Sequence, residues 1–207
     1  MSSRTGGIAL VLAMALAACG PSSSAPTTTD PGLLPPTTVE PSTTTGVRAA
    51  LAPVWQAIVA DDPSGAHAAF FPRSAYLRMK AGKVSDPSTD YAGRLLGTFD
   101  QDIDAYHREL GPDPAGAVLL GVVADPASAT WIPPGACLNT IGYWHLPRAR
   151  FVYRQHGAIR SFAVDSLISW RDAWWVVHLG PNPRPFPVGS VDLPEPGPGT
   201  PGPAGGC

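Results

Sequence analysis

The chain has 207 residues, a formal net charge of −2 and only 14% charged residues. Its 14 lysines and arginines form no basic run, which argues against a partner held by a basic surface, such as a nucleic acid. The length allows one ordinary domain. Arginine outnumbers lysine twelve to two, and alanine, glycine and proline are abundant, which is typical of a high-GC bacterial gene.

The first 18 residues have the three parts of an export signal. Arg4 gives the positive start, residues 8–16 form an apolar core, and Ala17-Ala18 gives the small-residue exit. A helix of this core is about 14 Å long, whereas the hydrocarbon core of a bilayer is about 30 Å thick. The pattern therefore predicts a signal peptide over residues 1–18 rather than a transmembrane anchor or a buried helix.

The run Leu16-Ala17-Ala18-Cys19 resembles the lipobox of bacterial lipoproteins, position for position. The resemblance implies cleavage before Cys19, a thioether-linked lipid on its sulfur and an acyl chain such as palmitate on the new N-terminus. Several acyl chains hold a protein stably at a membrane, whereas one chain binds only marginally. We therefore expect a cell-envelope protein, lipid-anchored to the extracytoplasmic face of the cell membrane.

Residues 19–46 and 181–207 have compositions typical of disordered chain. Between residues 21 and 46, 18 of 26 residues are Pro, Ser or Thr. The few apolar side chains that remain cannot bury enough surface to offset the entropy cost of ordering the segment. Residues 181–207 contain nine prolines and six glycines and cannot join the interior of a sheet. We expect the first segment to be an extended tether and the second to be disordered or wrapped over the surface.

The first half of the expected domain, residues 47–180, has helical periodicity. Apolar residues recur at helical spacing over 47–59, and Pro53 either places the helix start near Leu51 or kinks the helix. A second, short helix is expected over residues 64–71. A longer helix is expected over residues 90–110, ended by a Gly-Pro pair.

The second half changes to the two-residue period of strands. Strands are expected over residues 117–124, 140–146, 149–155, 158–170 and 174–179, with residues 131–137 as a loop. His156-Gly157 and Arg171-Asp172 provide tight turns. Helices followed by an antiparallel meander predict an α+β fold with helices packed on one face of a curved sheet.

This order of elements and the ending SWRDAWWVVHLG (residues 169–180) resemble the nuclear transport factor 2-like (SnoaL-like) superfamily. The resemblance implies a cone in which a curved sheet wraps around helices, with a pocket on the concave face of the sheet. A cystatin-like sheet is the alternative. The stretches FFPRSAYLRMKAG, WIPPGACLNTIGYWHLP and SFAVDSLISWRDAWWVVHLGPNPRP also resemble a family of actinobacterial lipoproteins, and that resemblance implies no activity.

The two turns fix a strand register that brings an acid and a base together. If both turns have two residues, Asp165 lies opposite Arg148 on one side and opposite His178 on the other. An Asp–His pair beside an arginine can carry out acid–base chemistry, since the carboxylate orients the imidazole. The alternatives are a cross-strand salt bridge, or a three-residue second turn that pairs His178 with Ser166. His145 and His107 are expected at the surface.

Five of the six tryptophans lie within residues 131–175, and two of them are adjacent. Trp174 and Trp175 cannot both point into one core, so one of them should line a pocket or lie exposed. The alternative is that a helix or the proline-rich tail covers it. Trp174, Trp175 and Arg148 are therefore candidate ligand-binding residues.

Two cysteines remain when Cys19 carries lipid. An oxidising compartment allows Cys137 and Cys207 to pair, closing a loop of about 70 residues and stabilising the fold by roughly 4 kcal/mol. The alternative is that Cys207 stays free or pairs between molecules.

No cofactor or metal site is expected, because the cysteines and histidines lack zinc-ligand spacing. Asp100, Asp102 and Asp104 lack the glycine and the last glutamate of a calcium loop. We expect them to favour a helix start instead, with Asp100 as the N-cap.

The sequence contains none of the nucleophile or phosphate-loop motifs. We therefore expect a non-enzymatic module that binds an envelope protein or a small ligand. The alternative is a small enzyme of the cone type that uses Asp165 and His178.

Overall fold

The computed structural model describes residues 29–184 and 188–203. The expected signal peptide, Cys19 and Cys207 lie outside these ranges, so lipidation and the Cys137–Cys207 bond stay predictions. Within the described ranges, no helix is both long enough and apolar enough to cross a membrane.

The first half of the described chain is helical. Its main helices are α1 (Thr45–Ala60), α2 (Pro63–Ala66), α3 (Arg73–Met79), α4 (Pro87–Asp90), a π-helical segment η3 (Tyr91–Leu96) and α5 (Gly97–Glu109). Short 3₁₀ turns are η1 (Pro31–Leu33), η2 (His67–Ala69), η4 (Pro114–Gly116), η5 (Pro126–Ser128) and η6 (Ala136–Leu138).

Helix α1 begins at Thr45 and holds Pro53 in its interior, so the first of the two alternatives for Pro53, a helix start near Leu51, is wrong. Segments α4, η3 and α5 follow one another without a break. Their common start is capped by Asp86, whose carboxylate accepts from the N–H groups of the next turn. Asp100 is therefore not the N-cap that we expected, because the helix begins far upstream; it pairs instead with His67 Nε2 at 2.8 Å.

The second half forms an antiparallel sheet of six strands, which confirms the α+β class. The strands are β1 (Val118–Val123), β2 (Thr130–Ile132), β3 (Tyr143–Gln155), β4 (Ala158–Trp170), β5 (Ala173–His178) and β6 (Asp192–Pro196). The strand order is β1-β3-β4-β5, with β2 also paired to β3 and β6 also paired to β4. Strand β2 occupies the start of the expected loop over residues 131–137.

The first expected register, between β3 and β4, is confirmed on both sides of Arg148: Pro147 pairs with Ser166, and Ala149 with Val164. Arg148 itself, with a φ of 43°, is not paired with Asp165 in this register, so that expected pair is not formed. The turn has positive φ at both His156 (49°) and Gly157 (79°), as a type I′ hairpin requires.

The expected register between β4 and β5 is correct only next to the turn that joins them. Ile168 pairs with Trp175 as expected, but a bulge follows, and His178 pairs with Ser166. The expected pairing of Asp165 with His178 is therefore wrong. Its cause is an extra residue in β5, since a bulge shifts every later pair along the strand.

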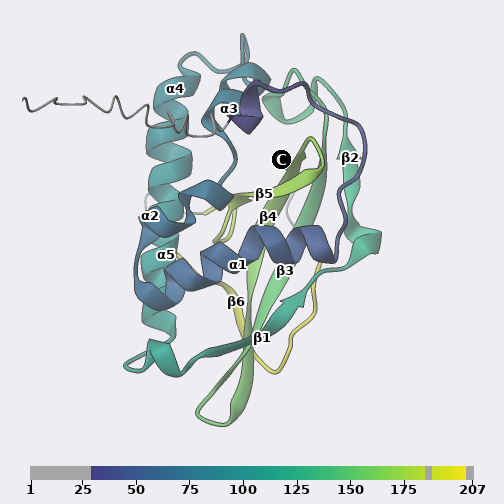
Figure 1. The fold of residues 1–207 in the computed structure, drawn as a ribbon. Coiled ribbons are helices and arrows are strands. Elements are labelled where there is room, and N and C mark those ends of the chain that lie inside the picture. Colours follow the sequence, from purple (N-terminus) through teal and green to yellow (C-terminus); the bar gives the residue numbers. More distant parts are fainter. Residues whose placement is uncertain (1–28, 185–187, 204–207) are drawn as a thin grey trace, which may run out of the picture.

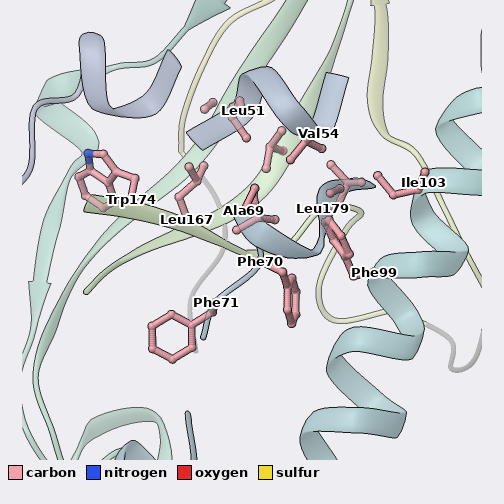
Figure 2. Packing of buried hydrophobic residues seen from close by; sticks show 14 of the residues in the cluster. Leu51, Val54, Ala69, Phe70, Phe71, Phe99, Ile103, Leu167, Trp174 and Leu179 are labelled. Atoms are coloured by element: carbon pink, nitrogen blue, oxygen red, sulfur yellow. The ribbon is translucent and has the colours of Figure 1, made fainter. Parts of the chain in front are cut away.

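The helices pack on the sheet through a core that Figure 2 shows at close range. Leu51 and Val54 of α1 lie above Leu167 and Trp174 of the sheet. On the α5 side, Phe99 lies against Phe70, with ring centroids 4.8 Å apart. Sequence periodicity places these apolar side chains on the inner faces of their elements.

The N-terminal segment (residues 30–44) packs along the domain rather than hanging free as a tether. In Figure 1 this purple segment runs from beside α3, past β2, to the start of α1. Three indole N–H groups donate to its carbonyls: Trp170 to Pro31, Trp144 to Thr38, and Trp174 to both Pro41 and Ser42. A proline-rich extended chain keeps its carbonyl groups free for such donors, and an indole N–H requires an acceptor when buried.

The C-terminal segment (residues 188–203) is wrapped over the sheet, one of the two outcomes expected for it. It contributes β6, which pairs with the first half of β4. Further on, Gly202 N donates to Arg148 O, and Arg148 Nη1 donates to Pro203 O. The folded unit therefore extends beyond the expected limits of residues 47 and 180 on both sides.

Candidate functional site: a pocket between α3 and the sheet

A pocket of about 170 Å³ opens between the helices and the sheet. Helix α3, segment η3, the loop around η6 and the ends of β3, β4 and β5 enclose it. Its apolar lining consists of Met79, Leu95, Ile132, Ile168 and Val177. Its polar and charged lining includes Tyr76, Lys80, Arg94, Asn139, Tyr143, His145, Ser166 and His178.

Two irregularities in the backbone shape this pocket. The π-helical turn carries both Arg94 and Leu95 to the lining, and such turns inside α-helices recur at functional sites. The β5 bulge places His178 across from Ser166, so that both line the pocket. Neither irregularity has a sequence signal that periodicity can detect.

Both pocket histidines are held neutral. His145 Nε2 lies 2.7 Å from Ser166 Oγ, and burial lowers the pKa of His145. Burial, with the nearby Arg94 guanidinium, lowers the pKa of His178 to about 3. A neutral imidazole offers one donor and one acceptor. The expectation that His145 lies at the surface is wrong, since only 7% of it is exposed.

A tyrosine–aspartate–arginine network forms one wall of the pocket. Arg94 holds Asp90 through two nitrogens, with Nε–Oδ1 at 2.6 Å and Nη2–Oδ2 at 2.8 Å. Tyr76 Oη donates to the same carboxylate. Burial, followed by this hydrogen bond, raises the pKa of the Tyr76 phenol. The charges of Asp90 and Arg94 therefore neutralise one another.

Lys80 supplies the unbalanced charge of the pocket. Its ammonium donates to Cys137 O at 2.9 Å and lies 5.8 Å from the centre of the Tyr76 ring. Within the described ranges, no carboxylate forms an ion pair with Lys80. Burial lowers the pKa of Lys80, as expected for a cation held away from water. The pocket therefore has a positive balance and one ammonium available to an anion.

The two residues expected to act together are separated. His178 lines the pocket, while Asp165 does not. Neighbouring strand residues point to opposite faces, and Asp165 is the neighbour of the pocket residue Ser166. Burial, and then the nearby Asp192 carboxylate, raises the pKa of Asp165 to about 7.

The candidate binding residues Arg148, Trp174 and Trp175 also lie outside the pocket lining. Arg148 Nε is 3.5 Å from Asp192 Oδ2 in the C-terminal segment. Trp174 is covered, with only 2% exposed, whereas Trp175 is half-buried. Both border a shallow hollow beside α1. A helix or the C-terminal tail was expected to cover the tryptophan pair. The N-terminal segment lies over Trp174 instead, and its carbonyl groups at Pro41 and Ser42 accept hydrogen bonds from the Trp174 indole.

The remaining sequence candidates have structural contacts. His107, expected at the surface, is half-buried and donates from Nδ1 to Ile58 O at 2.8 Å. Cys137 lines the pocket, and its expected partner Cys207 lies outside the described residues. In the part of the chain that the structure describes, no three His, Cys, Asp or Glu residues are grouped to hold a metal ion.

Comparisons with protein-family models, with curated proteins and with solved structures find no match to this chain.

Proposed function

We propose that the chain is a lipid-anchored cell-envelope protein whose domain binds a small organic anion with an apolar body. One observation carries the binding proposal: a pocket of about 170 Å³, lined by both apolar and polar side chains, contains the ammonium of Lys80 without a paired carboxylate among the described residues. The lipobox at Leu16–Cys19 supports the anchor.

The size of the pocket limits the ligand. An apolar cavity of about 150 Å³ in another protein takes up benzene, so this pocket suits a ligand about as large as one ring. The ligand's carboxylate meets Lys80, and its body lies against Met79, Leu95 and Ile168. The neutral histidines then serve as hydrogen-bond partners rather than as charges.

We further infer that the domain has a nuclear transport factor 2-like fold, with a cystatin-like fold as the alternative. Support comes from the order of the elements, with helices before an antiparallel sheet, and from the pocket between them. The proposal of a binding module does not depend on this kinship.

The enzyme alternative has less support than binding. It requires Asp165 and His178 to act as a pair, but the β5 bulge pairs His178 with Ser166 instead. Without that pair, the pocket has two neutral imidazoles, and among the described residues no hydrogen bond joins either of them to a carboxylate.

Three probes of equal size test the proposed ligand class: benzoate, benzyl alcohol and benzylammonium. Calorimetric titration of the full mature chain should give the tightest binding with benzoate. Replacing Lys80 by Met should weaken benzoate binding about tenfold or more, since a hydrogen bond to a charged group contributes about 1.5–3 kcal/mol. Lys83→Met is the matched control, because Lys83 lies outside the pocket lining. Equal binding of the three probes, or no binding, would overturn the proposal.

Native mass spectrometry of the protein extracted gently from its own membrane tests the anchor and the natural ligand together. The expected species starts at acylated Cys19 and carries extra mass that is lost on denaturation. A chain that starts at Met1 without lipid would rule out the anchor.

A further inference from the structure

The pocket lining contains a buried amide oxygen that no described residue satisfies. Asn139 lines the pocket and is only 3% exposed. Its Nδ2 donates to Tyr143 Oη at 3.2 Å, whereas no donor within the described ranges reaches its Oδ1. A buried acceptor without a partner is destabilising, and buried polar atoms are therefore almost always paired. A ligand in the pocket can supply the missing donor.

The loop around η6 fixes Asn139 in this position. The backbone N–H of Asn139 donates to Ala136 O at 2.9 Å, and its carbonyl group accepts from Gly135 N at 2.7 Å. The next residue, Thr140, joins the loop to the end of α3, because its N–H donates to Met79 O at 2.8 Å. The backbone and the Nδ2 group of Asn139 are thus both held, and Oδ1 keeps its place in the lining.

Tyr143 supplies a donor beside this acceptor. Its hydroxyl oxygen accepts from Asn139 Nδ2, and among the described residues no acceptor takes the hydroxyl proton. Burial raises the pKa of the Tyr143 phenol, which keeps that proton in place. The pocket therefore offers one acceptor and one donor on two side chains that are hydrogen-bonded to each other.

The ammonium of Lys80 lies close to this pair. It donates to Cys137 O at 2.9 Å, and Cys137 precedes Asn139 by two residues in the same loop. A one-ring acid whose carboxylate meets Lys80 can therefore present the edge of its ring to Asn139 and Tyr143.

We propose that the pocket selects a hydroxylated aromatic acid, whose hydroxyl group donates to Asn139 Oδ1 and accepts from Tyr143 Oη. The inference rests on the proposed binding of a small organic anion and adds a second specificity contact to it. A hydroxyl group is both a donor and an acceptor, as these two side chains require. A methyl group of similar size can do neither, and it would leave Asn139 unpaired.

Two pairs of acids of similar size test the contact: 3-hydroxybenzoate against 3-methylbenzoate, and 4-hydroxybenzoate against 4-methylbenzoate. Both members of a pair carry the same carboxylate, and only one of them can donate from the ring. In calorimetric titration of the full mature chain, the hydroxy acid of at least one pair should bind about fivefold or more tightly than its methyl counterpart. If neither hydroxy acid binds more tightly, the proposal is overturned, and a pocket water is the partner of Asn139 Oδ1.

Two variants assign the preference to its residues. Asn139→Leu removes the acceptor at similar size, and the extended backbone there (φ −112°, ψ 140°) suits leucine. The ratio of hydroxy-acid to methyl-acid affinity should fall to about one in this variant and fall in part in Tyr143→Phe. Lys83→Met, outside the pocket lining, should keep the wild-type ratio. A wild-type ratio in both pocket variants would overturn the assignment, and the wild-type comparison is decisive even if Asn139→Leu does not fold.

Benzoate separates this inference from the proposed function. If benzoate binds and loses affinity in Lys80→Met, but neither hydroxy acid exceeds its methyl counterpart, the hydroxyl contact alone is overturned. If none of the acids binds, the anion site is overturned, and the hydroxyl contact with it.

Discussion

A single buried carboxylate, Asp102, fixes the path of the chain after the last strand of the main sheet. It accepts hydrogen bonds from Gly180 N at 2.9 Å and Ser190 N at 3.0 Å, and it pairs with the guanidinium of Arg184. Buried carboxylates are stable only when their acceptor sites are filled in this way. Asp102 therefore joins α5 to the loop that delivers the C-terminal segment to β4.

The histidine in the pocket gives a pH prediction at the same scale. The pKa of His178 is about 3 in the folded chain, against 6.5 for an unperturbed histidine. Between these values the unfolded chain binds a proton that the folded chain does not, so stability falls as the pH drops below about 6.5. Relative to a His178→Gln variant, the wild type should lose up to about 1.4 kcal/mol of unfolding free energy per pH unit.

Urea unfolding of both proteins at several pH values between about 7 and 4 measures this difference. His156→Asn is the control, because His156 is exposed in the hairpin turn, where asparagine tolerates the positive φ. Parallel curves for the wild type and His178→Gln would show that His178 titrates normally in the folded protein.

At the scale of elements, the N-terminal segment is held by donors from other parts of the chain. Arg78 of α3 donates to both Gly32 O and Leu34 O, each at 2.9 Å, and its guanidinium carbon lies 5.4 Å from the centre of the Trp170 ring. The segment itself supplies few apolar groups. The fixed conformation of the N-terminal segment therefore depends on hydrogen-bond donors from other parts of the chain, which cannot be predicted from the composition of the segment itself.

Replacing Arg78 by Met should release the start of this segment. The loss of two charge-assisted hydrogen bonds should destabilise the protein by about 2–3 kcal/mol, and the Gly32–Leu33 bond should become a site of thermolysin cleavage. Arg48→Met, at an exposed position of α1, should change neither the stability nor the cleavage rate. An uncleaved Arg78→Met protein of wild-type stability would mean that the tryptophan donors alone hold the segment.

The elements also show which parts of the structure can be predicted from sequence. The β3–β4 hairpin follows from two local signals, the alternating pattern around Phe151 and Phe162 and the turn at His156-Gly157. The pairing of His178 could not be predicted, because a bulge in β5 depends on tertiary packing rather than on residue period. The same applies to the η3 segment, whose sequence reads as ordinary helix. The pocket depends on both irregularities, and so the sequence does not indicate that its lining residues lie together.

At the scale of the whole molecule, both end segments complete the central sheet. The N-terminal segment supplies acceptors for three tryptophans. The C-terminal segment covers Arg150, which is fully buried and donates to Leu193 O at 2.8 Å, with Glu195 at 3.2 Å. A central sheet stripped of these segments would expose indole groups and leave a buried cation unpaired.

A set of fragments tests this dependence. Residues 47–180, the unit that periodicity suggests, should fail to form a fixed tertiary structure, because this fragment lacks strand β6 and the carbonyl groups that accept from three indole N–H groups. Each buried polar group left without a partner costs about 1–3 kcal/mol, out of a typical total stability of about 5–15 kcal/mol. Residues 29–203 should unfold cooperatively, with the same midpoint as the mature chain when both are measured in the presence of a thiol reductant, which removes the expected Cys137–Cys207 bond from the comparison. Near-UV circular dichroism and urea titration distinguish the two, since a collapsed but unfixed chain loses its aromatic signal and its sharp transition. Residues 29–180 and 47–203 then assign the loss to one segment or the other. If residues 47–180 unfolded as sharply as the longer fragment, the two segments would be coverings of an independent domain rather than parts of it.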